Sequence, residues 1–104
     1  MTTFLVEGWT ERIRHQLKSD NVVVDLTDAD VELLVRDHDD VDVALGGTSG
    51  IDTALEGIAF YDPTGSEFQA SGSPYTMRYK VTDQSGAVSF FPNGDPGVIK
   101  VRAT

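Results

Sequence analysis

The sequence predicts an all-β protein, namely one antiparallel β-sandwich of about six to eight short strands. Apolar and polar residues alternate along several short segments, most clearly at residues 75–81, which is typical of half-buried strands. Clusters of Gly, Pro, Asp, Asn and Ser separate these segments at intervals that suit turns. The 104 residues form a single domain, 1–104, because a second domain would have no core of its own.

The first quarter of the chain predicts a short strand followed by a hairpin. Residues 4–6 form the first strand. Residues 12–17 alternate like a strand but also match helical spacing, so periodicity leaves both structures open. A turn cluster at 18–21 and the β-branched residues of 22–26 make a hairpin the simplest arrangement.

Two structures also fit the next segment. Residues 27–30 resemble a helix N-cap, and Glu32 with Arg36 forms an i, i+4 pair. Residues 29–36, however, alternate with period two and one exception, which favours a strand. Residues 37–53 are rich in Asp, Gly, Ser and Thr and predict a long exposed acidic and Gly-rich loop or, as the alternative, a mobile edge.

The second half predicts a meander of strands and turns. Strands are predicted at residues 57–61, 75–81, 87–91 and 98–102, and turns at 62–65, 83–86 and 92–97. Adjacent aromatic residues within a strand place one ring on each face of a sheet. We therefore expect one ring of Phe60-Tyr61 and one of Phe90-Phe91 to point outward, where it is either an interface anchor or a residue covered by a loop.

The charge balance weighs against nucleic acid as a partner. The net charge is −9, and such a surface repels phosphate unless the five Arg converge on one patch. Asp outnumbers Glu twelve to five and there are only three Lys, a balance that resembles proteins from high-salt organisms. An ordinary acidic protein has the same features, so both readings stay open.

Several classes of protein are excluded by composition. The absence of cysteine removes disulfides, thiolate metal sites and cysteine nucleophiles. No run approaches the ~20 apolar residues of a membrane span, and the N-terminus lacks the features of a signal peptide. We therefore expect a soluble protein made in the cytoplasm, with no membrane partner.

The sharpest cluster of candidate metal ligands is residues 37–42, with four carboxylates in six residues. Carboxylate oxygens are hard ligands that suit calcium. The spacing fails the EF-hand pattern because Val41 stands at a ligand position and the turn Gly and terminal Glu are missing. A solvated acidic loop is the favoured interpretation, and no metal site is predicted.

Catalytic motifs are likewise missing from the sequence. His15 and His38 are the only histidines, and the serine within residues 47–50 lacks the elbow that exposes a nucleophile. The turns at 72–75 and 94–97 lack phosphate-loop spacing. We predict no enzyme, no catalytic residue and no cofactor.

The segments together, in their order, resemble a known family. The matching parts are Glu7-Gly8 followed by Ile13 and Leu17, residues 24–27 leading into 31–36, then 57–61, 75–81, Gly86, and Phe91-Pro92 before 99–102. This order resembles the immunoglobulin-like N-terminal domain of phage baseplate upper proteins and related small tailed-virus structural proteins. The chain departs from the family at Gly8-Trp9, where Gly-Asp is common, and in the acidity of residues 37–53.

The resemblance implies an immunoglobulin-like sandwich and a non-enzymatic virion protein. It would be a tail, baseplate or neck adaptor that packs against other virion proteins and its own copies in a symmetric assembly. The alternatives are a capsid decoration or turret protein and, from another class, a soluble carbohydrate- or calcium-binding module. The family's further domains have no counterpart in this sequence, so a receptor-binding or fibre-holding role is not carried over.

Overall fold

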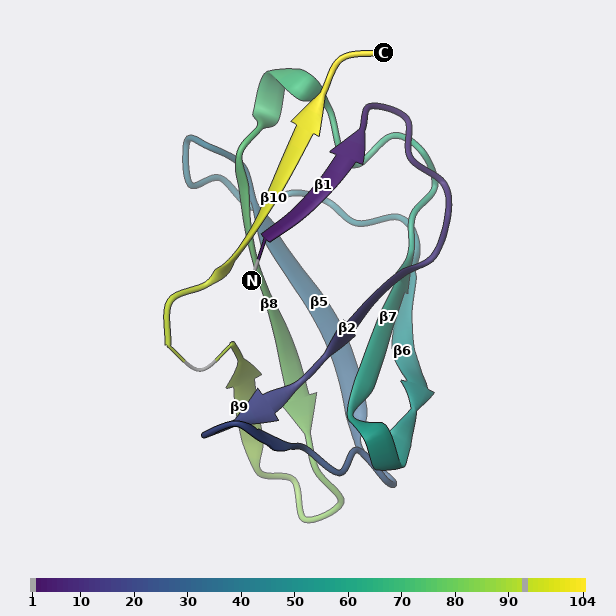
Figure 1. Cartoon of the computed structure of the whole chain (residues 1–104), viewed down its shortest axis with the longest axis vertical. Helices are drawn as coiled ribbons and strands as arrows, with labels where there is room; N and C mark the ends of the chain where they lie inside the picture. Colours follow the sequence, from purple (N-terminus) through teal and green to yellow (C-terminus); the bar gives the residue numbers. More distant parts are fainter. Residues whose placement is uncertain (1, 93) are drawn as a thin grey trace.

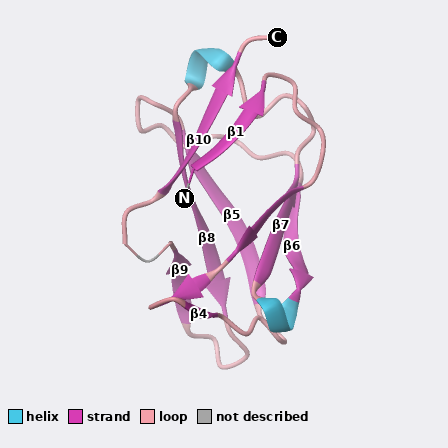
Figure 2. Cartoon of the chain, viewed as in Figure 1, coloured by secondary structure: helices cyan, strands magenta, loops and turns pink. Residues whose placement is uncertain are grey.

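A computed structural model describes residues 2–92 and 94–104 and confirms an all-β sandwich (Figures 1 and 2). The strands are β1 (Thr2–Val6), β2 (Ile13–Gln16), β3 (Lys18–Ser19), β4 (Val22–Val23), β5 (Asp30–Arg36), β6 (Thr48–Thr53), β7 (Ile58–Asp62), β8 (Tyr75–Thr82), β9 (Val88–Phe91) and β10 (Gly97–Arg102). Two single 3-10 turns, η1 (Ala54–Glu56) and η2 (Ala70–Gly72), lie at opposite ends of the molecule (Figure 2).

Two sheets form the sandwich. The larger has the order β1-β10-β8-β5, with β9 also paired to β8, and the smaller has the order β2-β7-β6. β3 and β4 form a separate two-stranded hairpin. The core lies between the two sheets and includes the fully buried side chains of Tyr61, Tyr79 and Ile99.

Buried and more exposed residues alternate without exception along β5 and β8, so the segment for which helix and strand were both open is a strand. Val31, Leu33 and Val35 are buried while their neighbours are exposed, and all seven residues of β5 pair with β8. A helix over this segment would lose that ladder and would turn some of the apolar side chains toward water. Residues 13–16 are likewise a strand, β2, because they pair with β7.

Single side chains join the two sheets at both open sides of the sandwich. On one side, His15 of β2 lies between Thr3 of β1 and Tyr79 of β8, with 2.8 Å from a ring nitrogen to each hydroxyl. On the other side, the backbone N–H of Leu33 in β5 donates to Ser49 Oγ of β6 at 3.3 Å. Polar links of this kind fix how one sheet lies over the other.

The prediction of one exposed loop over 37–53 is wrong in its last third. Residues 48–53 form β6, an edge strand paired with β7, and Ile51 packs against the core. The strand is difficult to detect because it holds one glycine and three small hydroxyl residues and buries little apolar surface. The exposed segment therefore ends at about residue 47.

The predicted strand over 22–26 is also too long. The hairpin consists of β3 and β4, turning at Asp20 and Asn21 with φ of 50° and 65°. The N–H of Val24 still donates to the Leu17 carbonyl, in register with the hairpin, but the N–H of Leu26 donates to the Ala54 carbonyl. The chain therefore leaves the hairpin after Val24, and Leu26 lies in the core.

One strand pair is parallel, against the prediction of a purely antiparallel sandwich. β1 runs parallel to β10, with Phe4 opposite Lys100. β1 continues into β2 of the other sheet, so no tight turn joins it to β10 and no hairpin fixes their relative direction. The first and last strands of the chain thus lie side by side (Figure 1).

Candidate functional site

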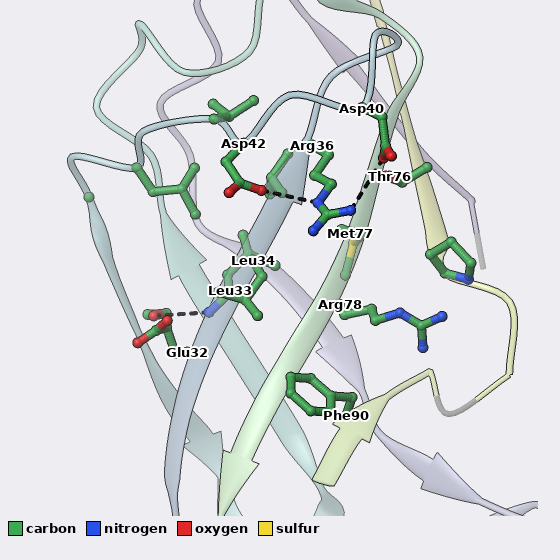
Figure 3. A pocket seen from close by; sticks show the side chains of 16 residues that line it. Glu32, Leu33, Leu34, Arg36, Asp40, Asp42, Thr76, Met77, Arg78 and Phe90 are labelled. Carbon is green, nitrogen blue, oxygen red and sulfur yellow. Dashed lines mark hydrogen bonds and ion pairs between the residues drawn. The ribbon is translucent and has the colours of Figure 1, made fainter. Parts of the chain in front are cut away.

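An open groove of about 1220 Å³ lies on the outer face of the larger sheet. Its floor is formed by β5 and β8, and its rims are formed by β9, by Pro96 before β10 and by residues 40–49 (Figure 3). Because Met77 and its alternate neighbours on β8 point into the core, Thr76 and Arg78 point outward into the groove. The groove is thus a direct product of the strand alternation.

Two apolar side chains are exposed beside this groove. Leu34 of β5 is 38 % exposed and Phe90 of β9 is 42 % exposed. Phe91 is buried, so the prediction that one ring of the Phe90-Phe91 pair points outward is confirmed, and Tyr61 and Phe60 divide in the same way. Exposed apolar and aromatic side chains beside a concave surface are typical of protein-binding faces.

The acidic segment 37–42 closes one end of the groove and is internally paired. Arg36 donates to Asp42 at 3.0 Å and to Asp40 at 3.5 Å, and these contacts raise the pKa of Arg36, with Asp42 the larger cause. The Asp37 carboxylate accepts from the backbone N–H of Asp39 and Val41. Three of the four carboxylates in this segment therefore bind Arg36 or the loop's own backbone.

The contacts of the carboxylates in residues 37–42 bear on whether this segment could bind calcium. Within residues 2–92 and 94–104, no group of three or more His, Asp or Glu side chains is arranged to hold a metal ion. The favoured reading of 37–42 as a solvated acidic loop agrees with its exposure, since Asp39, Asp40 and Asp42 have side chains 72 %, 78 % and 85 % exposed.

Arg78 holds together the break between β9 and β10. β9 pairs with one half of β8 and β10 with the other half, so the two short strands lie on the same side of β8. The Arg78 guanidinium donates to the carbonyls of Pro92 and Gly94, between these strands. This contact explains why an arginine stands on the groove floor, and the sequence alone offered no signal for it.

The outer face of the smaller sheet carries arginines and aspartates whose charges largely compensate each other in ion pairs. Arg12 donates to both oxygens of Asp62 at 2.7 and 2.9 Å, and Arg14 to Asp52 at 2.7 Å. The Arg12 guanidinium also lies 3.8 Å from the ring centroid of Phe60. The hydrogen bond from Arg12 is the main cause of the lowered pKa of Asp62. This face offers little free charge to a partner.

The two histidines differ in burial and in the residues that they contact. His15 is part-buried between Thr3 and Tyr79, and its burial lowers its pKa. His38 is exposed, beside Asp39 at 3.4 Å. Ser49, which the sequence placed in a flexible loop, instead accepts from the Leu33 amide within β6. The structure does not bring either histidine to this serine.

A buried carboxylate, Glu67, is the main polar feature that the sequence did not reveal. It is 6 % exposed and accepts from the Tyr61 hydroxyl, from Thr64 Oγ1 and from the backbone N–H of Gly65. Burial raises the pKa of Glu67, but the hydrogen bonds outweigh it and leave the pKa lowered to about 2. Its surroundings are closed, so its role is to hold residues 62–67 in place.

Among the described residues, neither 3-10 turn nor any other helix has the length and apolar content needed to cross a membrane. No family model, curated protein or solved structure matches this sequence.

Proposed function

We propose that this chain is a non-enzymatic structural protein that works through protein–protein packing in a symmetric assembly. The observation that carries the proposal is the groove on the larger sheet with Leu34 and Phe90 exposed beside it. A rigid sheet face that presents apolar anchors with a charged rim suits a protein partner. Beside Leu34, the groove floor presents Thr76 and Arg78, whose guanidinium is bound to backbone carbonyls.

The placement in a virion rests on the resemblance to tailed-virus structural proteins. On this proposal the chain is a tail, baseplate or neck adaptor whose partners are other virion proteins and its own copies. Capsid decoration is the second candidate, because a small rigid sandwich with one binding face also suits attachment to a shell.

Quantitative mass spectrometry of purified virus particles tests the proposal. We expect a few to a few dozen copies per particle for a tail, baseplate or neck adaptor. Hundreds of copies would indicate capsid decoration. Absence from the particle would overturn both and favour a soluble binding module.

A pair of variants tests the face itself. Phe90→Asp places a charge on the proposed contact, whereas Gln84→Asp places the same charge in the exposed turn between β8 and β9. We expect particles assembled with Phe90→Asp to carry fewer copies, and particles with Gln84→Asp to carry the normal number. Equal incorporation of both variants would remove the groove from the packing interface.

A further inference from the structure

The charges of this protein are distributed unevenly over its surface. The outward positions of the larger sheet carry five of the eight Lys and Arg but only two of the 17 Asp and Glu. The basic residues are Arg36, Arg78, Lys80, Lys100 and Arg102, and the acidic ones are Asp30 and Glu32. The strands of this face therefore carry more positive than negative charge in a chain whose net charge is −9, while Asp40 and Asp42 beside β5 pair with Arg36.

The unpaired part of this positive face lies on β1 and β10. We define the basic patch as Phe4, Lys100 and Arg102. Phe4 is 72 % exposed, and Lys100 Nζ lies 5.9 Å from its ring centroid. Within the described part of the chain, neither Lys100 nor Arg102 has an ion-pair partner, whereas Arg36 binds two aspartates. The basic patch thus combines an exposed aromatic ring with free positive charge.

β1 also leaves backbone groups at the outer edge of the sheet. The Glu7 N–H donates to the Arg102 carbonyl at 2.9 Å, so alternate residues of β1 face β10. In a parallel ladder the residues between them face away, which places the N–H and C=O of Phe4 at the free edge. A free edge is a further reason for a partner to contact this side.

The acidic loop, defined as Asp39–Asp42, lies at the other rim of the same sheet. It follows β5, while the basic patch lies on β1 and β10, and β5 and β1 are the two outermost strands in the order β1-β10-β8-β5. Val41 in the loop is 57 % exposed between the aspartates. The loop therefore presents an apolar side chain ringed by negative charge, the complement of the basic patch.

We infer that this chain associates head to tail, the acidic loop of one copy binding the basic patch of a second copy. The inference rests on the proposed function and names the contact that would build the assembly. A two-fold contact between basic patches would oppose like charges, which disfavours it. The two surfaces are different and lie at opposite rims, so two bound copies still have one acidic loop and one basic patch free. Further copies can therefore bind, and the contact closes into a ring or extends as a filament.

Sedimentation velocity of the full chain over a concentration series tests this contact. At about 0.15 M salt the Debye length is about 8 Å, so the net charge of whole molecules is screened while touching charges still interact. We expect species larger than a dimer at high concentration. Raising the salt to about 1 M is expected to weaken the association at least several-fold.

Charge reversals with matched controls locate the two surfaces. We expect Lys100→Glu to weaken association about tenfold or more, and Lys18→Glu, the same change on an exposed residue of β3, to leave it unchanged. Asp39→Lys is expected to act like Lys100→Glu, with Glu11→Lys as its control in another exposed loop. A thermal melt of each variant separates lost association from lost folding.

The double variant Lys100→Glu/Asp39→Lys tests whether the two surfaces bind each other. A head-to-tail contact pairs the two reversed charges again, so association returns toward that of the natural chain. A chain that is monomeric at every concentration, a dimer indifferent to Lys100→Glu, or a double variant weaker than both singles would overturn the inference. Such results leave the proposed function standing if particle analysis still finds the chain, because its partners would then be other virion proteins.

Discussion

His15 and Tyr79 meet between the two sheets, with 2.8 Å separating the imidazole Nδ1 from the phenolic oxygen. The rings are also in edge contact, with centroids 5.5 Å apart. Tyr79 is fully buried in β8 at the centre of the larger sheet, and His15 comes from the smaller sheet, so the pair is a polar link between the two sheets. The Thr3 hydroxyl is hydrogen-bonded to the other imidazole nitrogen, which extends the link to β1.

Stability is expected to fall as the pH drops below about 6.5, the ordinary pKa of histidine. Burial lowers the pKa of His15, so between its folded and unfolded pKa values the unfolded chain binds more protons. The contribution of neutral His15 to the free energy of unfolding is complete above the pKa of His15 in the unfolded chain. It is lost as the pH falls toward the lower pKa of His15 in the folded protein. Melting followed by the fluorescence of Trp9, the single tryptophan, measures this decrease.

Histidine variants identify the group responsible for that pH dependence. We expect His15→Gln to flatten the curve between pH 7.5 and 5 and His38→Gln to keep it, because His38 is exposed. The opposite pattern would assign the effect to the acidic loop. Tyr79→Phe is expected to cost about 1–3 kcal/mol at neutral pH, since a buried ring nitrogen loses its partner.

Glu67 is expected to dominate the loss of stability in acid. Its pKa is lowered to about 2 by the hydrogen bonds that outweigh its burial, against an ordinary value near 4.5. Glu67 therefore contributes about 3 kcal/mol to the free energy of unfolding at neutral pH. This contribution is complete above the pKa of the unfolded chain and falls as the pH drops from that pKa toward the pKa of the folded protein. Unfolding in urea at pH 7 and pH 3 measures the part of this contribution that is lost above pH 3.

Glu67→Gln and the matched surface change Glu11→Gln separate this effect from general acid sensitivity. We expect Glu67→Gln to lower the free energy of unfolding by about 2 kcal/mol at pH 7 and to reduce the difference between the two pH values. Glu11→Gln should do neither. If Glu67→Gln melts like the natural chain, the carboxylate does not hold residues 62–67 as we describe.

The contrast between β8 and β6 shows what the sequence can and cannot predict. The alternation of residues 75–81 is complete, so both the strand and its inward face follow from periodicity. β6 holds Gly50 and only partly buried side chains, so its pairing with β7 depends on partners distant in sequence. The same applies to the basic patch, since no local pattern predicts that β1 lies parallel to β10.

Gly47, just before β6, is expected to tolerate no side chain. A Cβ atom at this position would lie 2.0 Å from the Asp62 carbonyl oxygen and 2.7 Å from Tyr61 Oη, and the Gly47 N–H already donates to that hydroxyl. We expect Gly47→Ala to destabilise the fold by about 3 kcal/mol or more, because backbone must move to make room. Chemical denaturation measures the loss.

The neighbouring glycine provides the control for this substitution. A Cβ atom at Gly46 would meet only Thr64 Cγ2, at an ordinary 3.6 Å. Gly46→Ala is therefore expected to change the free energy of unfolding by less than about 1 kcal/mol. Equal effects of the two variants would mean that β6 does not approach β7 as closely as the structure describes.

Low salt is expected to destabilise the folded chain. Most of the 17 acidic residues lie outside the strands of the larger sheet, and the exposed aspartates of the acidic loop are close neighbours, of which Asp40 and Asp42 share Arg36. Lowering the salt lengthens the Debye length from about 3 Å at 1 M to about 30 Å at 0.01 M, so their repulsion then acts across the whole domain. Melting temperatures measured over this range at constant pH should rise with salt, and Asp39→Asn should reduce the slope by relieving one of the repelling charges. A melting temperature independent of salt would show that the negative surface is already balanced within the fold, and it would count against adaptation to a high-salt environment.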